Sequence, residues 1–497
     1  MSSHSLDRRG LLLAGAGIAT TAALVTFEPA AAGEAVTKTF RGHFSPTDTE
    51  DWRYLPFRVP KGVRQIEVSY SYPPPNDTGL GFSTNVIDIG IFDASGVGLG
   101  NAAGFRGWTG GARSSFRLSR GSATPGYLAG PIEPGRWRIS LGPYQIMSRV
   151  DYEVTVTLRF GPRGPAFESA PAPTAVPGTG HGWYRGDLHV HTVFSDGSQT
   201  RRQVLEYAQA AGLDFIGTSE HNNSSATRTW GRHVPEGFLV INGEEVTTRG
   251  GHWLATGLPA DTWIDWRYRP EDDRLAEFTQ QVRDLGGLSI AAHPNVPVPS
   301  IRWDYDPGFS EVDAVEVWNG PWSGVNAAFN AQTVKRWHTL LSAGTFKPAV
   351  GNSDTHRQAQ QIGLAQTVVR AESLSTEAII AGYRAGHSWI AESSGIGLTF
   401  TATLGDVSGE CGDRVPSTVG DEVAVHLEAS GLDDGCVATL LGPAAATYGT
   451  AIASGGTVVV DATVPGGTAF VRAEVRRGSA TGQMVALTNP IFLTPAG

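Results

Sequence analysis

The middle of the chain, residues 181–394, alternates short apolar runs with amphipathic stretches, and this alternation restricts the possible folds more than any other feature. The apolar runs have the pattern of buried strands and lie at 214–218, 238–242, 288–292, 314–318 and 348–351. Helical patterns separate several of them, at 200–211, 272–285, 325–341 and 375–385. The alternation predicts an α/β fold, either a βα barrel or a sheet, whose chemistry lies at the carboxyl ends of the strands.

The regions on both sides of this segment have the pattern of β-structure. Residues 36–160 contain short runs of alternating apolar and polar residues, punctuated by Gly, Pro, Asn and Asp, and predict a β-sandwich. A linker rich in Pro, Ala and Gly follows at 161–180. From 395 to 497 strand-like runs return and predict a second, smaller β-domain.

The N-terminal segment, residues 1–32, has the pattern of a targeting signal. Arg8 and Arg9 precede an apolar run rich in Ala and Gly that extends to about Phe27, and small residues up to position 32 offer a cleavage site. This pattern is typical of twin-arginine export, so we expect a secreted or extracytoplasmic protein whose mature chain begins near Gly33. The alternative is a membrane anchor. The run is shorter than the ~18 apolar residues that span a bilayer, so we expect no stable membrane insertion.

Composition and cysteine content narrow the classes of function. The formal net charge is −10 and the isoelectric point is near 5.7, with no basic stripe. We therefore expect no binding to nucleic-acid duplexes and favour a small-molecule or phosphoester substrate. The two cysteines are Cys411 and Cys436, and in an oxidising compartment a disulfide between them is favoured over a zinc site or a thiol nucleophile.

The stretch GDLHVHTVFSDGSQT, residues 186–200, indicates the chemistry most directly. Residues two apart in a strand point to the same face. His189 and His191 would therefore direct their imidazoles to a common point, with Asp196 on the turn that follows. That arrangement predicts a metal site, although two histidines alone also fit the exposed face of a strand.

Further ligand-type residues follow the other predicted strands of the middle region. They lie in the motifs SEHN at 219–222, GEEVT at 243–247, GH at 251–252, HPN at 293–295 and DTH at 354–356. Each motif alone also fits a structural histidine or a carboxylate paired with arginine. Together they place six of the 13 histidines at predicted strand ends, on one rim of the fold. The other histidines show no such placement, and we interpret them as structural rather than as ligands: His4, His43, His181, His233, His338, His387 and His426.

Taken in order, HxH with SDG, EHN, GxE, GH, AHP and SDTH resemble the PHP family (polymerase and histidinol phosphatase) over about 210 residues. The upstream β-domain and the sequences GEEVTT and GHWLATG are similar to its exported carbaryl-hydrolase-like branch, the CehA/McbA group. The resemblance implies a distorted (βα)7 barrel, which is TIM-like, with two or three divalent metal ions at its C-terminal face. It also implies the metal ligands His189, His191, Asp196, His221, Glu245, His252, His293, Asp354 and His356.

The chain departs from the family pattern at one position. Many members have Asp before the third histidine, where this chain has Glu220. We interpret Glu220 as a residue that orients His221 or a bound water. Glu244 competes with Glu245 for the ligand role, and the Gly-x-Glu pattern favours Glu245.

The ligand types indicate the chemistry that such a centre performs. Imidazole and carboxylate ligands without thiolate suit Zn, Mn or Fe. We expect Glu245 to bridge two ions and Asp196 to act in the same catalytic centre, where a bridging water becomes the attacking hydroxide. Arg357, with Asn222 or Asn295, could hold substrate oxygens. The alternative is that Arg357 is a surface residue that contributes only to solubility.

These residues predict a metal-dependent hydrolase, and the wider family favours a phosphoesterase. The branch resemblance suggests the alternative of a carbamate, amide or ester hydrolase with an aromatic substrate. Five tryptophans could form an apolar rim for such a substrate or could pack in the core, and they are Trp253, Trp263, Trp266, Trp318 and Trp322. A third hypothesis is a non-catalytic surface-binding protein, and the intact ligand set argues against it.

Overall fold

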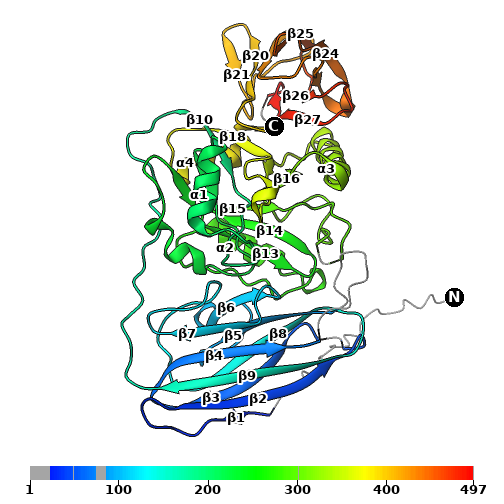
Figure 1. Ribbon diagram of the computed structural model, residues 1–497. Helices are drawn as coiled ribbons and strands as arrows, with labels where there is room; N and C mark the ends of the chain where they lie inside the picture. The colour runs from blue at the N-terminus through cyan, green and yellow to red at the C-terminus, as the bar shows by residue number, and fades with distance from the viewer. Residues whose placement is uncertain (1–22, 49, 74–84, 300, 496–497) are drawn as a thin grey trace, which may run out of the picture.

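The computed structural model describes residues 23–48, 50–73, 85–299 and 301–495. A β-sandwich, a central α/β region and a C-terminal β-region follow one another along the molecule (Figure 1). Residues 1–22, which hold the paired arginines and most of the predicted export signal, lie outside the described residues. None of the described helices is long and apolar enough to cross a membrane.

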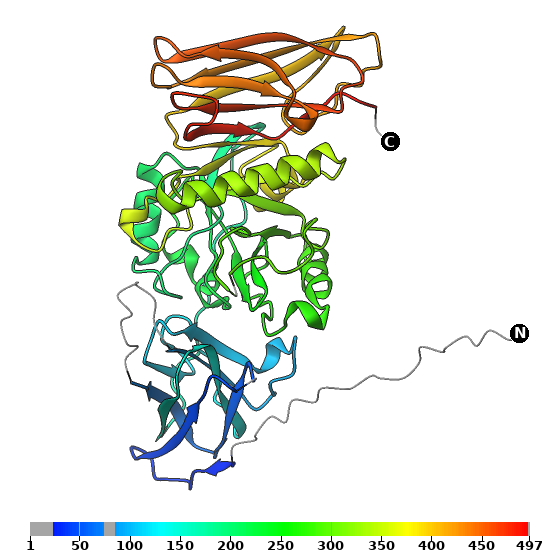
Figure 2. The same cartoon turned by 90° about the vertical axis from the view of Figure 1, so that its right-hand side faces the viewer.

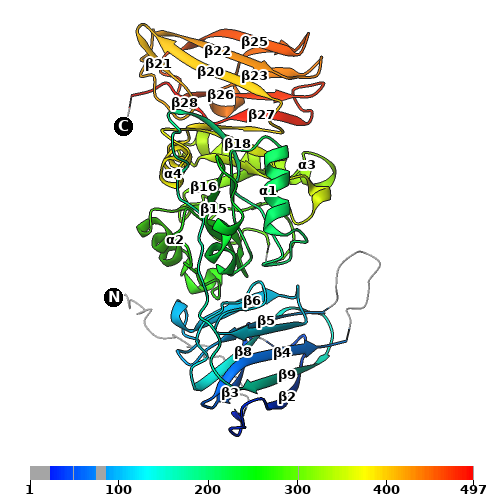
Figure 3. The same ribbon diagram turned by 60° about the vertical axis from the view of Figure 1, so that its left-hand side comes forward.

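The N-terminal sandwich consists of two sheets that share one apolar core (Figure 3). Their strand orders are β1-β3-β8-β5-β6 and β2-β9-β4-β7. The strands are β1 (Val25–Thr26), β2 (Ala35–Phe44), β3 (Arg53–Val59), β4 (Val63–Ser71), β5 (Asn85–Phe92), β6 (Phe105–Gly110), β7 (Ser115–Ser119), β8 (Gly135–Ile146) and β9 (Val150–Phe160). Every second residue of β9 is buried, as the two-residue period of a strand with one covered face requires.

The central region contains two sets of hydrogen-bonded strands. They are β10 (Gly182–Asp187), β11 (Phe215–Gly217), β12 (Leu239–Ile241), β13 (Gly243–Thr248), β14 (Gly251–Thr256), β15 (Leu288–Ala291), β16 (Ala314–Asn319), β17 (Ala349–Asn352), β18 (Gln366–Ala371) and β19 (Ser388–Ala391). The orders are β12-β11-β10-β18-β19 and β13-β14-β15-β16-β17. Isolated bridges between Val190 and Thr355 and between His221 and Glu245 connect the two sets.

This pairing differs from a regular (βα)7 barrel, in which all strands are parallel. The strands β10 to β12 and β15 to β17 are parallel, but β13, β14, β18 and β19 pair antiparallel with their neighbours. β13 and β14 form a hairpin through Arg249 and Gly250, a connection too short for a crossover helix, so these two strands must be antiparallel. The described residues form a mixed, sheet-rich α/β structure, and the closed seven-stranded barrel is not confirmed.

Among the described residues, four α-helices pack against the central strands. They are α1 (Arg201–Ala210), α2 (Leu275–Asp284), α3 (Gly324–Ser342) and α4 (Thr376–Ala385), and they confirm the four predicted helical stretches. The 3₁₀ helices are η1 (Ala102–Gly104), η2 (Ser225–Arg228), η3 (Trp230–Arg232), η4 (Pro270–Asp272), η5 (Gln358–Gln360) and η6 (Pro443–Ala445). α1 begins after Thr200, whose side chain accepts a hydrogen bond from the backbone of Gln203 in a capping box. α4 ends at Gly386 with a left-handed φ of 72°.

The C-terminal region continues the central sheet. Its strands are β20 (Gly397–Leu404), β21 (Val407–Gly409), β22 (Glu422–Ser430), β23 (Val437–Leu441), β24 (Thr447–Ile452), β25 (Thr457–Pro465), β26 (Phe470–Arg476), β27 (Met484–Thr488) and β28 (Ile491–Phe492). β27 pairs antiparallel with β19, so one sheet crosses the expected domain boundary at 395. α3 lies beneath the C-terminal strands (Figure 2), and Nδ1 of its His338 accepts a hydrogen bond from Arg472.

The two cysteines do not form the predicted disulfide. Cys411 and Cys436 are both free and buried, and both belong to the apolar cluster of the C-terminal region. Burial raises the pKa of each thiol, which keeps both protonated at neutral pH. The two side chains therefore act as small apolar core residues here.

The five tryptophans proposed as an apolar rim are core residues instead. All are at most 7% exposed and lie in one aromatic cluster. Trp263 stacks on Phe105 with ring centroids 4.2 Å apart, and Trp266 packs on Trp108 at 4.8 Å. The cluster joins the sandwich to the central region, so the packing alternative is the correct one.

Candidate metal centre

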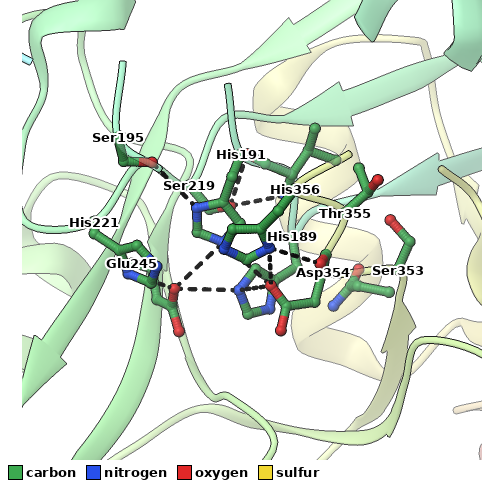
Figure 4. Close-up of polar contacts among 12 residues, drawn as sticks. His189, His191, Ser195, Ser219, His221, Glu245, Ser353, Asp354, Thr355 and His356 are labelled. Atoms are coloured by element: carbon green, nitrogen blue, oxygen red, sulfur yellow. Dashed lines mark hydrogen bonds and ion pairs between the residues drawn. The ribbon is translucent and has the colours of Figure 1, made fainter. Parts of the chain in front are cut away.

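All nine predicted metal ligands converge at the ends of the central strands. Figure 4 shows six of them, His189, His191, His221, Glu245, Asp354 and His356. The nine ligands form four overlapping groups, within each of which one ligand atom per residue lies within 4.8 Å of the others. The groups are His191, Asp196, His221 and His356; His189, His293 and Asp354; His189, His191 and Glu245; and Glu245, His252 and His293.

The central group comprises His189, His191, Glu245 and Asp354. Nε2 of His189 lies 3.4 Å from Oε2 of Glu245 and 3.3 Å from Oδ1 of Asp354. Nε2 of His191 lies 3.4 Å and 3.2 Å from the same two oxygens. Two atoms that bind one zinc ion at about 2.0–2.1 Å lie about this far apart, so each imidazole and each carboxylate of the group could share an ion.

Glu245 also faces a second, inner group formed with His252 and His293. Its Oε1 lies 2.9 Å from Nδ1 of His252 and 3.1 Å from Nε2 of His293. Oε2 faces the central group and Oε1 faces the inner group. A carboxylate whose two oxygens serve different groups has the geometry of a bridging ligand.

The group of His191, Asp196, His221 and His356, here called the rim group, is the most open part of the cluster. Oδ1 of Asp196 lies 3.5 Å from Nε2 of His221 and 3.3 Å from Nε2 of His356, and the Asp196 side chain is 46% exposed. The following residue, Gly197, packs against the backbone of His191 and Thr192. A Cβ there would lie 2.6 Å from the backbone nitrogen of Thr192, so only glycine allows this turn to bring Asp196 back to the histidines.

The central group consists of buried polar atoms with no hydrogen-bond partner. These atoms are Nε2 of His189, Nε2 of His191, Oε2 of Glu245 and Oδ1 of Asp354. Buried polar atoms in native proteins are almost always paired, because an unpaired one costs free energy. Four such ligand-type atoms in one cluster fit the binding of divalent cations.

Three side chains that the sequence analysis missed support the central group. Nδ1 of His189 donates to Oε1 of Glu316 at 3.1 Å, and Oε2 of Glu316 accepts from the backbone of His293 at 2.8 Å. Asn352 and Asn319 donate to the same carboxylate at 2.9 and 3.0 Å. Glu316 thereby orients two ligands at once.

Glu220 does not contact His221 in the way we expected. It is buried and accepts hydrogen bonds from the hydroxyls of Thr192 and Ser195, the latter at 2.6 Å. The Ser195 hydroxyl lies 3.4 Å from Nδ1 of His191. Glu220 therefore holds the loop that carries His191, and the Nδ1 of His221 instead meets the hydroxyl of Thr247 at 2.8 Å.

The charges of the cluster are strongly coupled. Burial raises the pKa of Glu245, but the imidazoles of His221 and His189 outweigh it and hold that pKa well below its usual range. Burial lowers the pKa of His221, but Glu245 and Asp196 outweigh it and raise the value to about 10. Burial and the neighbouring His356 lower the pKa of His191 to about 3. At neutral pH Glu245 is therefore ionised and His191 neutral, the forms that bind metals, whereas His221 would have to release a proton to bind one.

Three site residues have a left-handed backbone. The φ angles are 55° at Asn222, 30° at His293 and 51° at Asp354. Residues other than glycine adopt this region at a cost of about 1–3 kcal/mol, and such residues cluster at functional sites. Here His293 and Asp354 lie two residues after β15 and β17, and Asn222 lies five residues after β11.

A cavity of about 470 Å³ opens over the ligand cluster. Three residues proposed to hold substrate oxygens do not line it. Arg357 is exposed, Oδ1 of Asn222 accepts from the backbone of Thr247 at 2.7 Å, and Asn295 donates to Thr333 at 3.2 Å. Among the described residues that do line it are the amides of Asn319, Asn326 and Gln360, and nothing in their sequence context marked them.

No family model matches this chain. A stretch of 149 residues, 27% of this chain, is 28% identical to 81% of the uncharacterized protein MJ1587 of Methanocaldococcus jannaschii. A stretch of 64 residues, 12% of this chain, is 39% identical to the phosphoribosyl 1,2-cyclic phosphate 1,2-diphosphodiesterase of Eggerthella lenta and spans 24% of that protein.

Among solved structures, the chain is similar to a two-domain protein from Bacteroides vulgatus that is described as containing a predicted PHP-like metal-dependent phosphoesterase. The alignment covers 66% of this chain and 100% of that chain, with a TM-score of 0.36 and 16% sequence identity.

Proposed function

We propose that this chain is an exported, metal-dependent phosphoesterase of the PHP family, organised like the CehA/McbA branch. The observation that carries the proposal is the convergence of nine imidazole and carboxylate ligands in one cluster whose central atoms have no hydrogen-bond partner. The short stretch shared with a cyclic phosphodiesterase supports phosphoester over carbamate chemistry.

The cluster has room for two or three divalent ions, of which Zn, Mn and Fe suit the ligand set. His189, His191 and Asp354 would hold one ion, and Glu245 would share it with a second ion held by His252 and His293. The rim group would hold a third. Such ions act as Lewis acids and lower the pKa of bound water.

The chain's own residues prepare the site for a phosphoester. Glu316 accepts the Nδ1 proton of His189 and so keeps Nε2 free to bind. Thr247 and Ser195 lie against the Nδ1 atoms of His221 and His191 and fix the planes of these rings. The rim beside Asp196 is the open side of the cluster, so substrate would enter there.

Export is part of the proposal and rests on the sequence of residues 1–32. Twin-arginine translocation carries folded proteins. The metal ligands come from segments as far apart as His189 and His356, so they assemble only in the folded chain. Export in the folded state would allow the ions to be loaded before the protein leaves the cytoplasm.

The test is metal analysis of the purified protein together with a hydrolysis screen of p-nitrophenyl phosphate, bis-p-nitrophenyl phosphate and 1-naphthyl carbamate. We expect two or three tightly bound divalent ions and phosphoester hydrolysis that is lost on chelation and restored by added metal. Metal-dependent hydrolysis of the carbamate alone would replace the phosphoesterase proposal with the carbamate alternative. A chain that binds no metal would contradict both.

A further inference from the structure

Part of the cavity wall beside the metal ligands is apolar. Val296, Ile301, Pro321 and Phe329 line it, and each of these side chains is half-buried. Phe329 lies on the first half of α3, and Val296 follows β15. An apolar wall that remains partly open beside a polar cluster is typical of a pocket that holds an apolar group of a ligand.

The cavity has a second property, which concerns charge. Within the part of the chain that the structure describes, no Lys or Arg lines it. The doubly charged group of a phosphomonoester is usually gripped by arginine or lysine beyond the metal ions. A phosphodiester carries one negative charge and one more apolar substituent, so it matches this cavity better.

Gln360 supplies a fixed hydrogen-bond donor at the cavity edge. Its Oε1 accepts hydrogen bonds from the backbone nitrogens of His356 at 2.6 Å and Arg357 at 3.0 Å. Two N–H donors require the oxygen of the amide on their side, so the Nε2 group is turned away from the backbone. Because Gln360 lines the cavity beside His356, this NH₂ group is a neutral donor for a substrate oxygen.

We propose that the site hydrolyses phosphodiesters with an apolar substituent in preference to phosphomonoesters. The amide of Gln360 donates to a non-bridging phosphate oxygen, and the apolar substituent packs against Phe329 and Val296. Hydrolysis consumes one water, whose oxygen forms the new bond to phosphorus while the bond to one alcohol oxygen breaks. That alcohol leaves with a proton, and the other product is a phosphomonoester. The inference rests on the proposed phosphoesterase function and specifies its substrate class.

The first measurement compares substrates on the metal-loaded, full-length protein. We expect kcat/KM for bis-p-nitrophenyl phosphate to exceed that for p-nitrophenyl phosphate by about tenfold or more, as the extra apolar contact alone would allow. Calorimetric binding of diphenyl phosphate and phenyl phosphate gives a readout besides turnover. We expect the diester probe to bind more tightly.

Variants assign the preference to the named side chains. Gln360→Glu keeps an oxygen for the two backbone donors but presents a second oxygen in place of NH₂, so we expect KM for the diester to rise about tenfold. Its control is Gln358→Glu, an exposed position of the same 3₁₀ helix η5.

Phe329→Ala should lower the preference for the diester, whereas Val325→Ala, at a residue of α3 that is 71% exposed, should not. Metal content and circular dichroism of each variant check that the site and fold are retained.

The outcomes separate this inference from the proposed function. If the protein hydrolyses phosphoesters but prefers the monoester, or if Gln360→Glu behaves like Gln358→Glu, the phosphoesterase function stands and the diester inference is wrong. If only the carbamate is hydrolysed, the proposed function fails as well. If neither phosphoester turns over, equal or weaker binding of diphenyl phosphate relative to phenyl phosphate overturns the inference.

Discussion

Glu316 accepts a hydrogen bond from Nδ1 of His189 at 3.1 Å, on the side of the imidazole opposite to Glu245 and Asp354. The bond fixes the tautomer in which Nε2 of His189 carries its lone pair toward the central group. The same carboxylate accepts the backbone N–H of His293. One buried side chain therefore sets the direction of one ligand and the position of another.

Replacing Glu316 with Gln should weaken metal binding. The amide places a donor where His189, His293 and two asparagine side chains already donate, so at least one of these contacts becomes repulsive. We expect metal affinity to fall about 10–100-fold, as for other residues that orient metal ligands. Competition with a chromogenic chelator measures it. Glu377→Gln, exposed on α4, is the control, and equal affinity of the two variants would show that Glu316 has no role at the centre.

The positions of the metal ligands could be predicted because they depend on local geometry. Residues two apart in a strand share a face, so His189 and His191 had to converge. Parallel strands bring their carboxyl ends to one edge, so the ligands that follow β11, β15 and β17 had to lie near them. The helix bounds were equally accessible, since caps such as Thr200 and Gly386 are local features.

The supporting residues and the strand order could not be predicted in the same way. Glu316 lies in the apolar run 314–318, and its partner His189 is distant in sequence. Only the presence of a charged residue in a buried strand could have indicated that Glu316 has a specific partner. The hairpin of β13 and β14 depends on Arg249 and Gly250, a Gly-containing turn that the βα alternation obscured. Trp263 and Trp266 occupy the core because Phe105 and Trp108 of the sandwich cover them, which no local pattern shows.

Processing of the N-terminus affects the stability of the sandwich. β1 pairs with β3, and Phe27 is 3% exposed with its ring 6.1 Å from that of Phe57. A mature chain that begins near Gly33 lacks all of these contacts. We expect the form that begins at Gly33 to be about 2–3 kcal/mol less stable than one that begins at Ala23, the value of burying one phenylalanine.

Mass spectrometry of the exported protein and denaturant unfolding of both forms test this expectation. A first residue near Gly33 would support cleavage of the signal. An intact N-terminus would show that the leader is an anchor. Equal stability of the two forms would show that β1 contributes nothing to the sandwich.

Removing either histidine of the first motif should abolish hydrolysis. His189 and His191 are fully buried, and their Nε2 atoms have no hydrogen-bond partner, so their truncation removes a metal ligand without breaking a structural contact of that atom. We expect activity to fall by at least about 100-fold in His189→Ala and His191→Ala. His426→Ala, in a half-exposed ion pair with Asp461, is the control. Full activity in either of the first two variants would contradict the metal assignment.

Glu244 should make stability depend on pH. It is fully buried, and burial raises the pKa of its carboxyl well above the usual range. The pKa of this carboxyl is about 4.3 in the unfolded chain and higher in the folded chain. The protonated carboxyl therefore adds to the free energy of unfolding at low pH, and this contribution is lost as the pH rises through the folded pKa. Each pKa unit of difference between the folded and unfolded chain corresponds to about 1.4 kcal/mol in the free energy of unfolding. Glu244→Gln has no such loss, so its stability relative to the wild type should increase from pH 4.5 to pH 8. Denaturant unfolding at both pH values measures the difference, and a constant difference would show that Glu244 does not titrate this way.

Glu245 and Glu244 form the sharpest pair of variants, because neighbouring residues of β13 face opposite sides of the strand. The two oxygens of Glu245 face the central and inner groups, so its charge would offset the repulsion between two cations held by these groups. Glu245→Gln removes that charge and should reduce both the bound metal and the rate of hydrolysis, the rate by about 100-fold or more. Among the described residues, Glu244 accepts a hydrogen bond only from the backbone of Ile264, at 3.2 Å, and burial raises the pKa of its carboxyl, so Glu244→Gln should leave metal content and rate nearly unchanged. Metal stoichiometry and turnover of both variants test the assignment. A mild Glu245→Gln beside a damaging Glu244→Gln would mean that the ligand is Glu244.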